Sequence, residues 1–313
     1  MKNKTVIVTG ANSGVGLATT VELARRGATV VMACRSVERG EAALKLARER
    51  SGSDQLELLP CDLGSLESIR AFAGAARERH PVVDVLINNA GVVSLKRETT
   101  RDGFEAQLGV NHLGHFLLTL LLLEPLKRAP QGRVVTVSSG AHRVGNIHWA
   151  DPHFTRNYSV WRGYAQSKLA NILFTKGLAY RMRGTSVTAN CLHPGAVGTQ
   201  LGVDRDTGGG RAIMKLLSYV FITPEQGADT SVYRPPATRC PACPGSTSTA
   251  ASPPPCPGSP RTASRSNACG SGARSRWASC SPSLSLGQAL RRGSREGWNS
   301  EHHFSRIERS NSS

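Results

Sequence analysis

Short apolar runs rich in valine alternate with longer helical patterns through residues 5–192, and this alternation restricts the chain to very few folds. Each run is continuously apolar, which is typical of strands buried on both faces. Such strands alternating with helices predict an α/β fold with a doubly wound parallel sheet. We predict strands at 5–8, 29–33, 56–60, 83–88, 133–138 and 187–192, and helices at about 15–26, 37–50, 65–79, 102–126 and 164–183.

The composition of the chain changes abruptly after Tyr233. Residues 234–313 contain 18 Ser, 11 Arg and 10 Pro but no Val, Tyr or Met. Such a segment cannot bury enough apolar surface to offset the entropy lost on ordering, so we predict that it is disordered. The expected organisation is a single folded domain at 1–233 followed by a Pro/Ser/Arg-rich tail at 234–313.

The formal net charge of +17 raises the question of nucleic-acid binding. Residues 234–313 carry +8 of it, and residues 1–233 carry +9. Neither part contains an RNA- or DNA-binding motif, so we expect no nucleic-acid partner. A basic tail that acts as a binding module stays open as an alternative. A zinc site at Cys240 and Cys243 is disfavoured because the other tail cysteines form no second close pair, and we expect no metal.

No segment of the sequence resembles a signal peptide or a transmembrane helix. The most apolar run, Phe116–Leu123, is too short to span a bilayer. Cys34, Cys61 and Cys191 lie far apart and form no ligand pattern, which favours a reducing compartment. We therefore expect a cytoplasmic protein without a membrane anchor.

A glycine-rich turn joins the first predicted strand to the first predicted helix. Without side chains, its glycines let backbone N–H groups approach a pyrophosphate, and the helix N-terminus adds a favourable dipole. In this strand–turn–helix context the turn predicts a dinucleotide site. The residues that we expect to form it are Gly10, Asn12, Ser13, Gly14, Val15 and Gly16.

The end of the second predicted strand indicates which dinucleotide is bound. NAD sites usually place an acidic residue here, which accepts a hydrogen bond from the ribose 2′-OH. In this chain Cys34 stands where the acid would be, and Arg35 follows it. Because a guanidinium group suits the charged 2′-phosphate, we predict NADP as the cofactor.

Tyr164 and Lys168 form a Y-x3-K motif in a predicted helix. This spacing puts both side chains on one face, one turn apart. The unperturbed pKa of tyrosine is about 10, and a nearby ammonium group favours the phenolate and lowers it. Ser138 and Ser139 end the preceding strand, where a hydroxyl can bind a substrate oxygen. The pattern predicts an acid–base site.

These motifs, together with Asn88–Gly91 and His193–Thr199, follow the order of the short-chain dehydrogenase/reductase family, which the chain resembles over nearly all of residues 5–200. The resemblance implies a Rossmann-type fold and an NADP-dependent oxidoreductase. The glycine-rich turn, the Ala33–Arg35 strand end and the 25-residue gap from Ser139 to Tyr164 favour the retinol dehydrogenase-like branch.

The resemblance also assigns individual roles. The implied catalytic residues are Tyr164, Lys168, Ser139 rather than Ser138, and Asn111, which would hold a water of the proton relay. Asp62 would contact the adenine amino group or cap the following helix. Asn88 would tie neighbouring strands together, and His112 and His115 are interpreted as packing or surface residues. The further cofactor contacts implied are Leu63, Asn89, Ala90, Gly91, Pro194, Gly195, Val197 and Thr199.

The predicted reaction is hydride transfer between the nicotinamide and a small carbonyl or alcohol substrate. An apolar, glycine-containing segment at 201–222 predicts a mobile lid and a lipophilic substrate, such as an apolar aldehyde, a ketone or retinal. A homodimer could form through the helices at 102–126 and 164–183.

The tail bears on whether such an enzyme is active. The family has a last strand that we do not find here, so we expect the sheet to lack it and to expose an edge. Residues Cys243–Ser248 can be encoded TGT CCG GGA AGT ACT TCG. Two bases later this string gives Ser-Gly-Lys-Tyr-Phe, which resembles the family's last strand. A frameshift, and with it an inactive paralogue or gene-model artefact, is the alternative to an active enzyme.

Overall fold

The computed structural model describes residues 1–193 and the backbone of residues 247–249. Helices follow the strands in alternation, as the hydrophobic pattern predicts. The strands are β1 Thr5–Thr9, β2 Thr29–Cys34, β3 Leu56–Pro60, β4 Val85–Asn88, β5 Arg133–Val137, β6 Thr188–His193 and β7 Thr247–Thr249. The helices are α1 Gly14–Arg25, α2 Val37–Ser51, α3 Leu66–Arg79, α4 Ala106–Leu108, the π-helix η1 Gly109–Leu113, α5 Gly114–Leu121, α6 Leu123–Arg128, the 3₁₀-helix η2 Gly140–Val144 and α7 Val160–Arg181.

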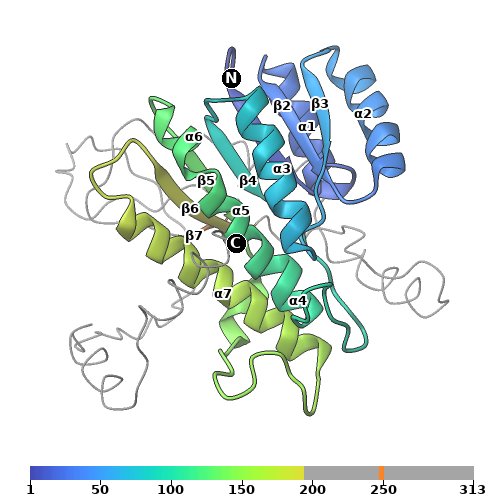
Figure 1. Cartoon of the computed structure of the whole chain (residues 1–313), viewed down its shortest axis with the longest axis vertical. Helices are drawn as coiled ribbons and strands as arrows, with labels where there is room; N and C mark the ends of the chain where they lie inside the picture. The colour runs from blue at the N-terminus through green and yellow to red at the C-terminus, as the bar shows by residue number, and fades with distance from the viewer. Residues whose placement is uncertain (194–246, 250–313) are drawn as a thin grey trace, which may run out of the picture. The chain divides into compact units, whose positions relative to one another are not determined.

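The strands form one parallel sheet in the order β3-β2-β1-β4-β5-β6-β7 (Figure 1). The chain begins in the middle of the sheet, runs outward to β3, returns to β4 beside β1, and then runs outward the other way. The order of the strands therefore reverses between β1 and β4. Ligands of such sheets bind beyond the carboxyl ends of the strands at this point. The predicted doubly wound α/β fold is confirmed.

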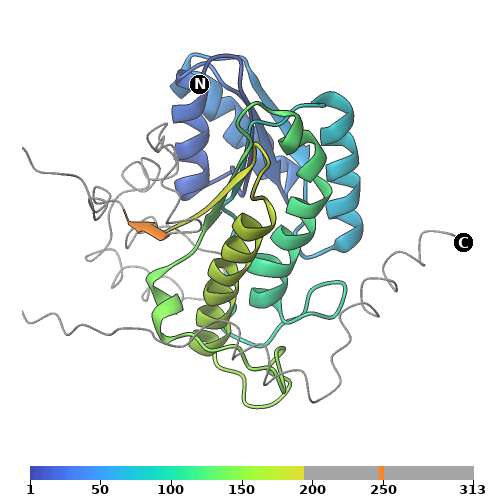
Figure 2. The same cartoon turned by 90° about the vertical axis from the view of Figure 1, so that its left-hand side faces the viewer.

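Two helical layers cover the sheet, and alternate strand residues point into each. Val30 and Met32 of β2 lie in a cluster with side chains of α1 and α2. Val31 and Ala33 lie in the opposite cluster with side chains of α3, α5, α6 and α7. Figure 2 shows α1 and α7 on opposite sides of the sheet. Because the central strands β1, β2 and β4 are buried on both faces, their apolar runs are continuous.

The helix predicted at 102–126 is broken into four pieces. Gly103 adopts a φ of 82° in a turn, and α4 begins only at Ala106, where the Glu105 carboxylate accepts from the Gln107 and Leu108 N–H groups. In the π-helix η1 the Gly114 N–H bonds to the Gly109 carbonyl, five residues back. Pro125 has no N–H to continue the helical ladder across the junction of α5 and α6. Hydrophobic periodicity alone could not predict these interruptions.

The structure also differs from the expectation of a missing last strand. β7 lies parallel to β6, with Thr247 opposite Cys191 and Thr249 opposite His193 (Figure 1). An unpaired edge of β6 would present free N–H and C=O groups, and any extended segment can satisfy them. The disorder predicted for the rest of the tail, and the boundary at 233, lie outside the described residues and stay predictions.

No helix in residues 1–193 is both long and apolar enough to cross a membrane. The longest, α7, buries several polar and charged residues, among them Gln166, Lys168 and Asn171. Lys168 and Asn171 donate to the Val137 carbonyl at the end of β5, whereas Gln166 bonds to His148 and Pro152 in the segment before the helix. The amphipathic character of α7 therefore serves the site as well as the core.

Candidate active site

The glycine-rich turn lies at the carboxyl end of β1, beside the reversal of strand order. Gly10 and Gly14 adopt φ values of 63° and 53°, which residues with side chains rarely take. A Cβ on Gly16 would collide with the Gly10 carbonyl oxygen and lie 2.6 Å from Asn89 Nδ2. Ser13 makes no side-chain hydrogen bond at the N-terminus of α1. The turn thus leaves the first N–H groups of α1 without a side-chain cap, which suits an anion.

The carboxyl end of β2 carries no negative charge. Burial raises the pKa of the Cys34 thiol to about 11, against the opposing effect of the Ala11 and Asn12 N–H groups, so the thiol is neutral. Arg35 follows it and is exposed, and it makes no hydrogen bond or ion pair with another residue of 1–193. Ser36 then caps α2 by accepting from the Arg39 N–H at 3.3 Å. A free guanidinium group therefore stands beside a second helix N-terminus.

Thr9 joins the glycine-rich turn to the end of β4. Its side-chain oxygen accepts from the Asn89 N–H at 2.9 Å and from the Ala90 N–H at 3.0 Å. Asn89 Nδ2 donates in turn to the Thr9 carbonyl at 2.8 Å. Asn88 donates to Thr119 of α5 at 2.9 Å, so it ties β4 to a helix rather than to a neighbouring strand. Asn89 and Ala90 thereby lie against the turn, as their predicted role requires.

Tyr164 and Lys168 lie one turn apart on α7. Lys168 is only 2% exposed, and its Nζ lies 5.6 Å from the centroid of the Tyr164 ring. Nζ also donates to the Val137 carbonyl at 3.2 Å, which holds the ammonium group at the end of β5. A positive charge beside a phenol stabilises the phenolate. The pair has the geometry that the motif predicts.

The two serines after β5 have different environments. Ser138 is buried, and its hydroxyl donates to the Lys168 carbonyl at 2.8 Å, so it fastens α7 to the sheet. Ser139 is half-buried, and its oxygen accepts from the Ala141 N–H at 3.3 Å at the start of η2. Only the Ser139 hydroxyl retains its proton for an incoming ligand. This agrees with the choice of Ser139 as the catalytic serine.

Asn111 sits in the π-helix η1, and every polar atom of its side chain is engaged. Oδ1 accepts from the Val92 N–H at 2.7 Å, and Nδ2 donates to the Val92 carbonyl at 3.1 Å and to Ser167 Oγ at 3.0 Å. The side chain therefore holds the segment following Gly91 against α7. Both Nδ2 hydrogens are used, so a water held by Asn111 would have to donate to Oδ1 or to the backbone carbonyl.

Asp62 and Leu63 follow β3. The Asp62 carboxylate accepts from the Gly64 N–H at 2.9 Å, and the cap of α3 is Ser65, which accepts from the Ser68 N–H at 3.2 Å. The suggestion that Asp62 caps the helix is therefore wrong. Leu63 is buried, and its carbonyl lies 2.5 Å from where a Cβ on Gly114 would be, so α5 approaches this loop closely.

Four predicted cofactor contacts, Pro194, Gly195, Val197 and Thr199, lie outside the described residues, as does the predicted lid at 201–222. Residues 1–193 contain no cluster of three or more His, Cys, Asp or Glu side chains that could hold a metal ion. The cysteine pair at 240 and 243 also falls outside the described part of the chain.

Sequence reasoning missed His115, which it placed among packing or surface residues. The imidazole is 1% exposed and contacts Thr9 Oγ1 at 2.8 Å and the Asn111 carbonyl at 3.0 Å. Burial lowers its pKa to about 4. Its partners lie 106 residues and 4 residues away in the chain, so the longer contact left no local pattern.

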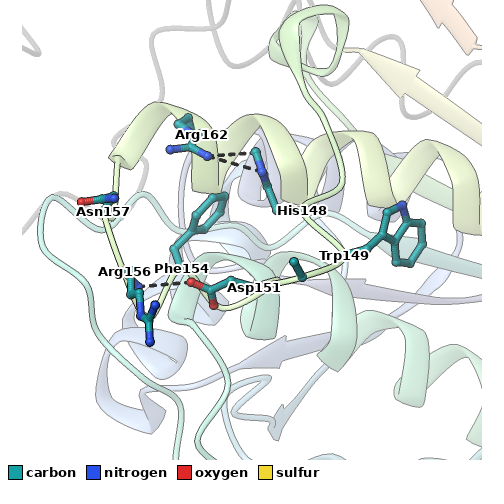
Figure 3. A pocket seen from close by; sticks show the side chains of 8 residues that line it. His148, Trp149, Asp151, Phe154, Arg156, Asn157 and Arg162 are labelled. Carbon is teal, nitrogen blue, oxygen red and sulfur yellow. Dashed lines mark hydrogen bonds between the residues drawn. The ribbon is translucent and has the colours of Figure 1, made fainter.

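A pocket of about 460 Å³ lies in the segment that leads from η2 to α7 (Figure 3). Phe154 is buried beneath it at a φ of 47°, with the His148 ring at 4.9 Å and the Arg162 guanidinium group at 5.1 Å. Trp149 is 82% exposed, and Figure 3 shows its ring turned away from Phe154 and Arg162. The pocket is separate from the residues gathered at the ends of β1, β4 and β5.

Comparison with known proteins agrees with this arrangement. The family model described as short chain dehydrogenase matches residues 4–208. Human retinol dehydrogenase 13 is 47% identical over 235 residues, which are 74% of this chain and 71% of that protein. Human retinol dehydrogenase 11 is also 47% identical over 235 residues, covering 74% and 73% of the two chains. A crystal structure of actinorhodin polyketide ketoreductase with NADPH is 25% identical, with a TM-score of 0.58, and covers 74% of this chain and 91% of that chain.

Proposed function

The chain belongs to the short-chain dehydrogenase/reductase family, in its retinol dehydrogenase-like branch, and on that premise we propose that it is an NADP-dependent reductase of apolar carbonyl compounds. The observation that carries the proposal is the buried Lys168 ammonium group beside the Tyr164 ring, at the strand end that also bears Ser139. An ammonium group next to a phenol stabilises the phenolate, so the phenol can give its proton to a substrate oxygen.

The residues at the ends of β1 and β2 fit NADP. The glycine-rich turn has no room for a Cβ at Gly16, so α1 begins packed against the Gly10 carbonyl, and its uncapped first N–H groups suit a pyrophosphate. The neutral Cys34 thiol and the exposed Arg35 guanidinium group, which has no partner among residues 1–193, suit a 2′-phosphate better than a 2′-hydroxyl. We assign the pyrophosphate to the turn Gly10–Gly16 and the phosphate to Arg35. Support also comes from the related ketoreductase whose structure contains NADPH.

The cofactor, when bound, supplies the hydride. Tyr164 then gives its hydroxyl proton to the substrate oxygen, and the Lys168 ammonium group stabilises the resulting phenolate. The Ser139 hydroxyl donates a hydrogen bond to the same oxygen as negative charge develops on it. Asn111 keeps its proposed place in the proton relay through a carbonyl oxygen of its side chain or backbone, because both of its Nδ2 hydrogens are already used. Asp62, Asn89 and Ala90 are proposed cofactor contacts.

A lipophilic aldehyde or ketone, including a retinoid, is the proposed substrate. The relatives' names support this class, since two of them are retinol dehydrogenases. Hydrophobic residues that would cover such a substrate fall in the segment 201–222, outside the described residues. The inactive-paralogue and binding-module alternatives depend on the tail and stay hypotheses, and so does the cytoplasmic location.

We also propose that two copies of the chain associate through α5 and α7. Both helices expose large apolar side chains, and the Phe116 and Phe174 rings contact each other between them at a tilt of 55°, with their centroids 5.2 Å apart. The exposed members of this set are Phe116, Leu120, Leu173 and Tyr180. Sedimentation equilibrium of the full chain tests the proposal, and a monomer at micromolar concentration would contradict it.

The experiment that tests the function is a thermal-shift titration followed by an activity assay. A ligand that binds only the folded state raises the melting temperature. We expect a saturable rise with NADPH, a smaller one with NADH, and NADPH oxidation when retinal or decanal is added. Equal shifts with both cofactors would reject the Arg35 assignment. NADPH binding without turnover of any apolar aldehyde or ketone would reject the reductase.

A further inference from the structure

We propose that His115 is a positioning residue, which fixes the glycine-rich turn relative to the π-helix η1 by holding the Thr9 hydroxyl and the Asn111 carbonyl at the same time. The proposal rests on the proposed function, because it concerns the geometry of that site. It assigns a role to a buried histidine whose side chain contacts Thr9 and the Asn111 carbonyl rather than Tyr164 or Ser139.

The two contacts fix which nitrogen carries the proton. The Asn111 carbonyl can only accept, so Nδ1 of His115 must donate to it across 3.0 Å. Burial lowers the pKa of this imidazole to about 4, and the charges of Lys168 and His112 act in the same direction. The ring is therefore neutral near pH 7, and Nε2 has a lone pair and no proton.

The protonation state of the imidazole then decides which acceptor the Thr9 hydroxyl donates to. Nε2 accepts, so Thr9 must donate to it across 2.8 Å. The Thr9 proton is consequently not available to the Ile87 carbonyl, which lies farther away at 3.3 Å. Both lone pairs of the Thr9 oxygen remain for the Asn89 and Ala90 N–H groups. The two His115 nitrogens, the Thr9 proton and the two Thr9 lone pairs are thus each used once.

This chain of hydrogen bonds connects three segments of the proposed site. Thr9 immediately precedes the glycine-rich turn, and Asn89 and Ala90 are proposed cofactor contacts. On the other side, the Asn111 side chain holds Ser167, the neighbour of Lys168 on α7. A displacement of His115 would therefore be felt both where the cofactor is bound and where the proton is transferred. A well-packed apolar side chain at this position would leave the Thr9 hydroxyl and the Asn111 carbonyl without that partner.

Two substitutions separate the two contacts. In His115→Asn the amide NH₂ stands near the place of Nδ1 and can still donate to the Asn111 carbonyl, but it is too short to reach Thr9. In His115→Gln the longer amide can accept from Thr9 but no longer serves Asn111. Thr9→Val removes the hydroxyl with little change in shape, and Thr9→Ser restores it. His112→Asn is the matched control, because it removes an imidazole from the same helical segment without touching Thr9.

We expect His115→Asn and Thr9→Val to raise the Kd for NADPH about tenfold, the size expected for losing one buried hydrogen bond, with kcat for decanal reduction little changed. His115→Gln should lower kcat about tenfold and leave the Kd nearly unchanged. The double variant Thr9→Val/His115→Asn should be no worse than either single variant. Thr9→Ser and His112→Asn should bind NADPH like the unaltered chain.

If Kd and kcat instead change together in proportion to the loss of melting temperature, or do not change at all, His115 is an ordinary core residue and the proposal is overturned. The unaltered chain is measured first, so failure of the proposed function is seen separately, as no NADPH binding in any sample.

If no sample binds NADPH, the proposal can still be tested by a measurement that does not involve the cofactor. Nitrogen NMR of the ¹⁵N-histidine-labelled full chain, with His115→Asn to assign the signals, should show an Nδ1-protonated ring that does not titrate between pH 5 and 8. Thr9→Val should shift the Nε2 signal of that ring. An Nε2-protonated or titrating His115 contradicts the proposal.

Discussion

The Nζ atom of Lys168 lies 5.6 Å from the centroid of the Tyr164 ring, one turn along the same helix. Lys168 is held from the other side by the Val137 carbonyl at the end of β5. The position of the ammonium group is therefore set by the sheet as well as by the helix. It follows that the chemistry of this pair can be tested with variants that leave the fold intact.

Replacing Tyr164 with phenylalanine should abolish turnover while preserving the cofactor site. The hydroxyl is the proposed proton donor, and loss of general acid catalysis typically costs about a hundredfold to ten-thousandfold in rate. Single-turnover reduction of decanal, together with the Kd for NADPH, measures the two effects. Tyr180→Phe, at an exposed position on the same helix, is the control. A Tyr164→Phe enzyme with normal kcat would remove this residue from the mechanism.

Replacing Arg35 with serine should weaken NADPH binding without affecting NADH. A hydrogen bond to a charged group contributes about 1.5–3 kcal/mol, so the Kd for NADPH should rise roughly tenfold to a hundredfold. Lys45→Ser, farther along α2, removes the same charge away from the helix N-terminus and should change neither Kd. Isothermal titration of both cofactors checks the prediction, and an equal loss for NADH would show that Arg35 does not distinguish them.

The neighbouring serines should respond in opposite ways. Ser139→Ala should lower kcat by about a hundredfold, the usual cost of losing one donor to a developing oxyanion, with little change in melting temperature. Ser138→Ala should instead cost about 1–3 kcal/mol in the free energy of unfolding, because it leaves the buried Lys168 carbonyl without its partner. Urea unfolding and steady-state rates separate the two. The assignment is reversed if Ser138→Ala is the variant that loses activity at full stability.

Acid should destabilise the protein through His115. Its pKa is about 4 in the folded chain against 6.5 for an unperturbed group, so below pH 6.5 the unfolded chain takes up a proton that the folded chain refuses. The free energy of unfolding should therefore fall by about 3 kcal/mol from this residue as the pH drops from 6.5 to 4. Urea unfolding at several pH values measures the slope. His115→Asn should make it shallower, and an unchanged slope would contradict the buried, neutral imidazole.

The gene offers a prediction of a different kind. The structure places β7 at Thr247–Thr249, and the alternative frame puts its tyrosine codon across positions 246 and 247 and its phenylalanine codon across 247 and 248. We expect the nucleotides of codons 243–248 to permit Gly-Lys-Tyr-Phe in that frame, which sequencing of the transcript can check. Codons that forbid these residues would make the tail an original part of this protein.

The sequence predicted the first six strands, their buried character and the glycine-rich turn at the end of β1, because periodicity and glycine placement are local signals. The breaks at Gly103 and Pro125 were missed because an apolar stripe conceals a change of helical pitch. The engagement of the Asn111 side chain and the role of His115 depend on partners such as Ser167 and Thr9, which folding alone brings close. Such contacts have no signature in a single sequence.

The pairing of β7 with β6 bears on how this protein tolerates a frameshift mutation. A parallel edge strand is held by its peptide groups, which every amino acid except proline supplies alike. Pairing at this edge of the sheet therefore depends little on which amino acids are encoded there. The roles proposed for Ser139, Tyr164 and Lys168, in contrast, each require one particular side chain. A frameshift downstream of α7 would leave Ser139, Tyr164 and Lys168 unchanged. The new residues could still supply peptide groups that pair with β6.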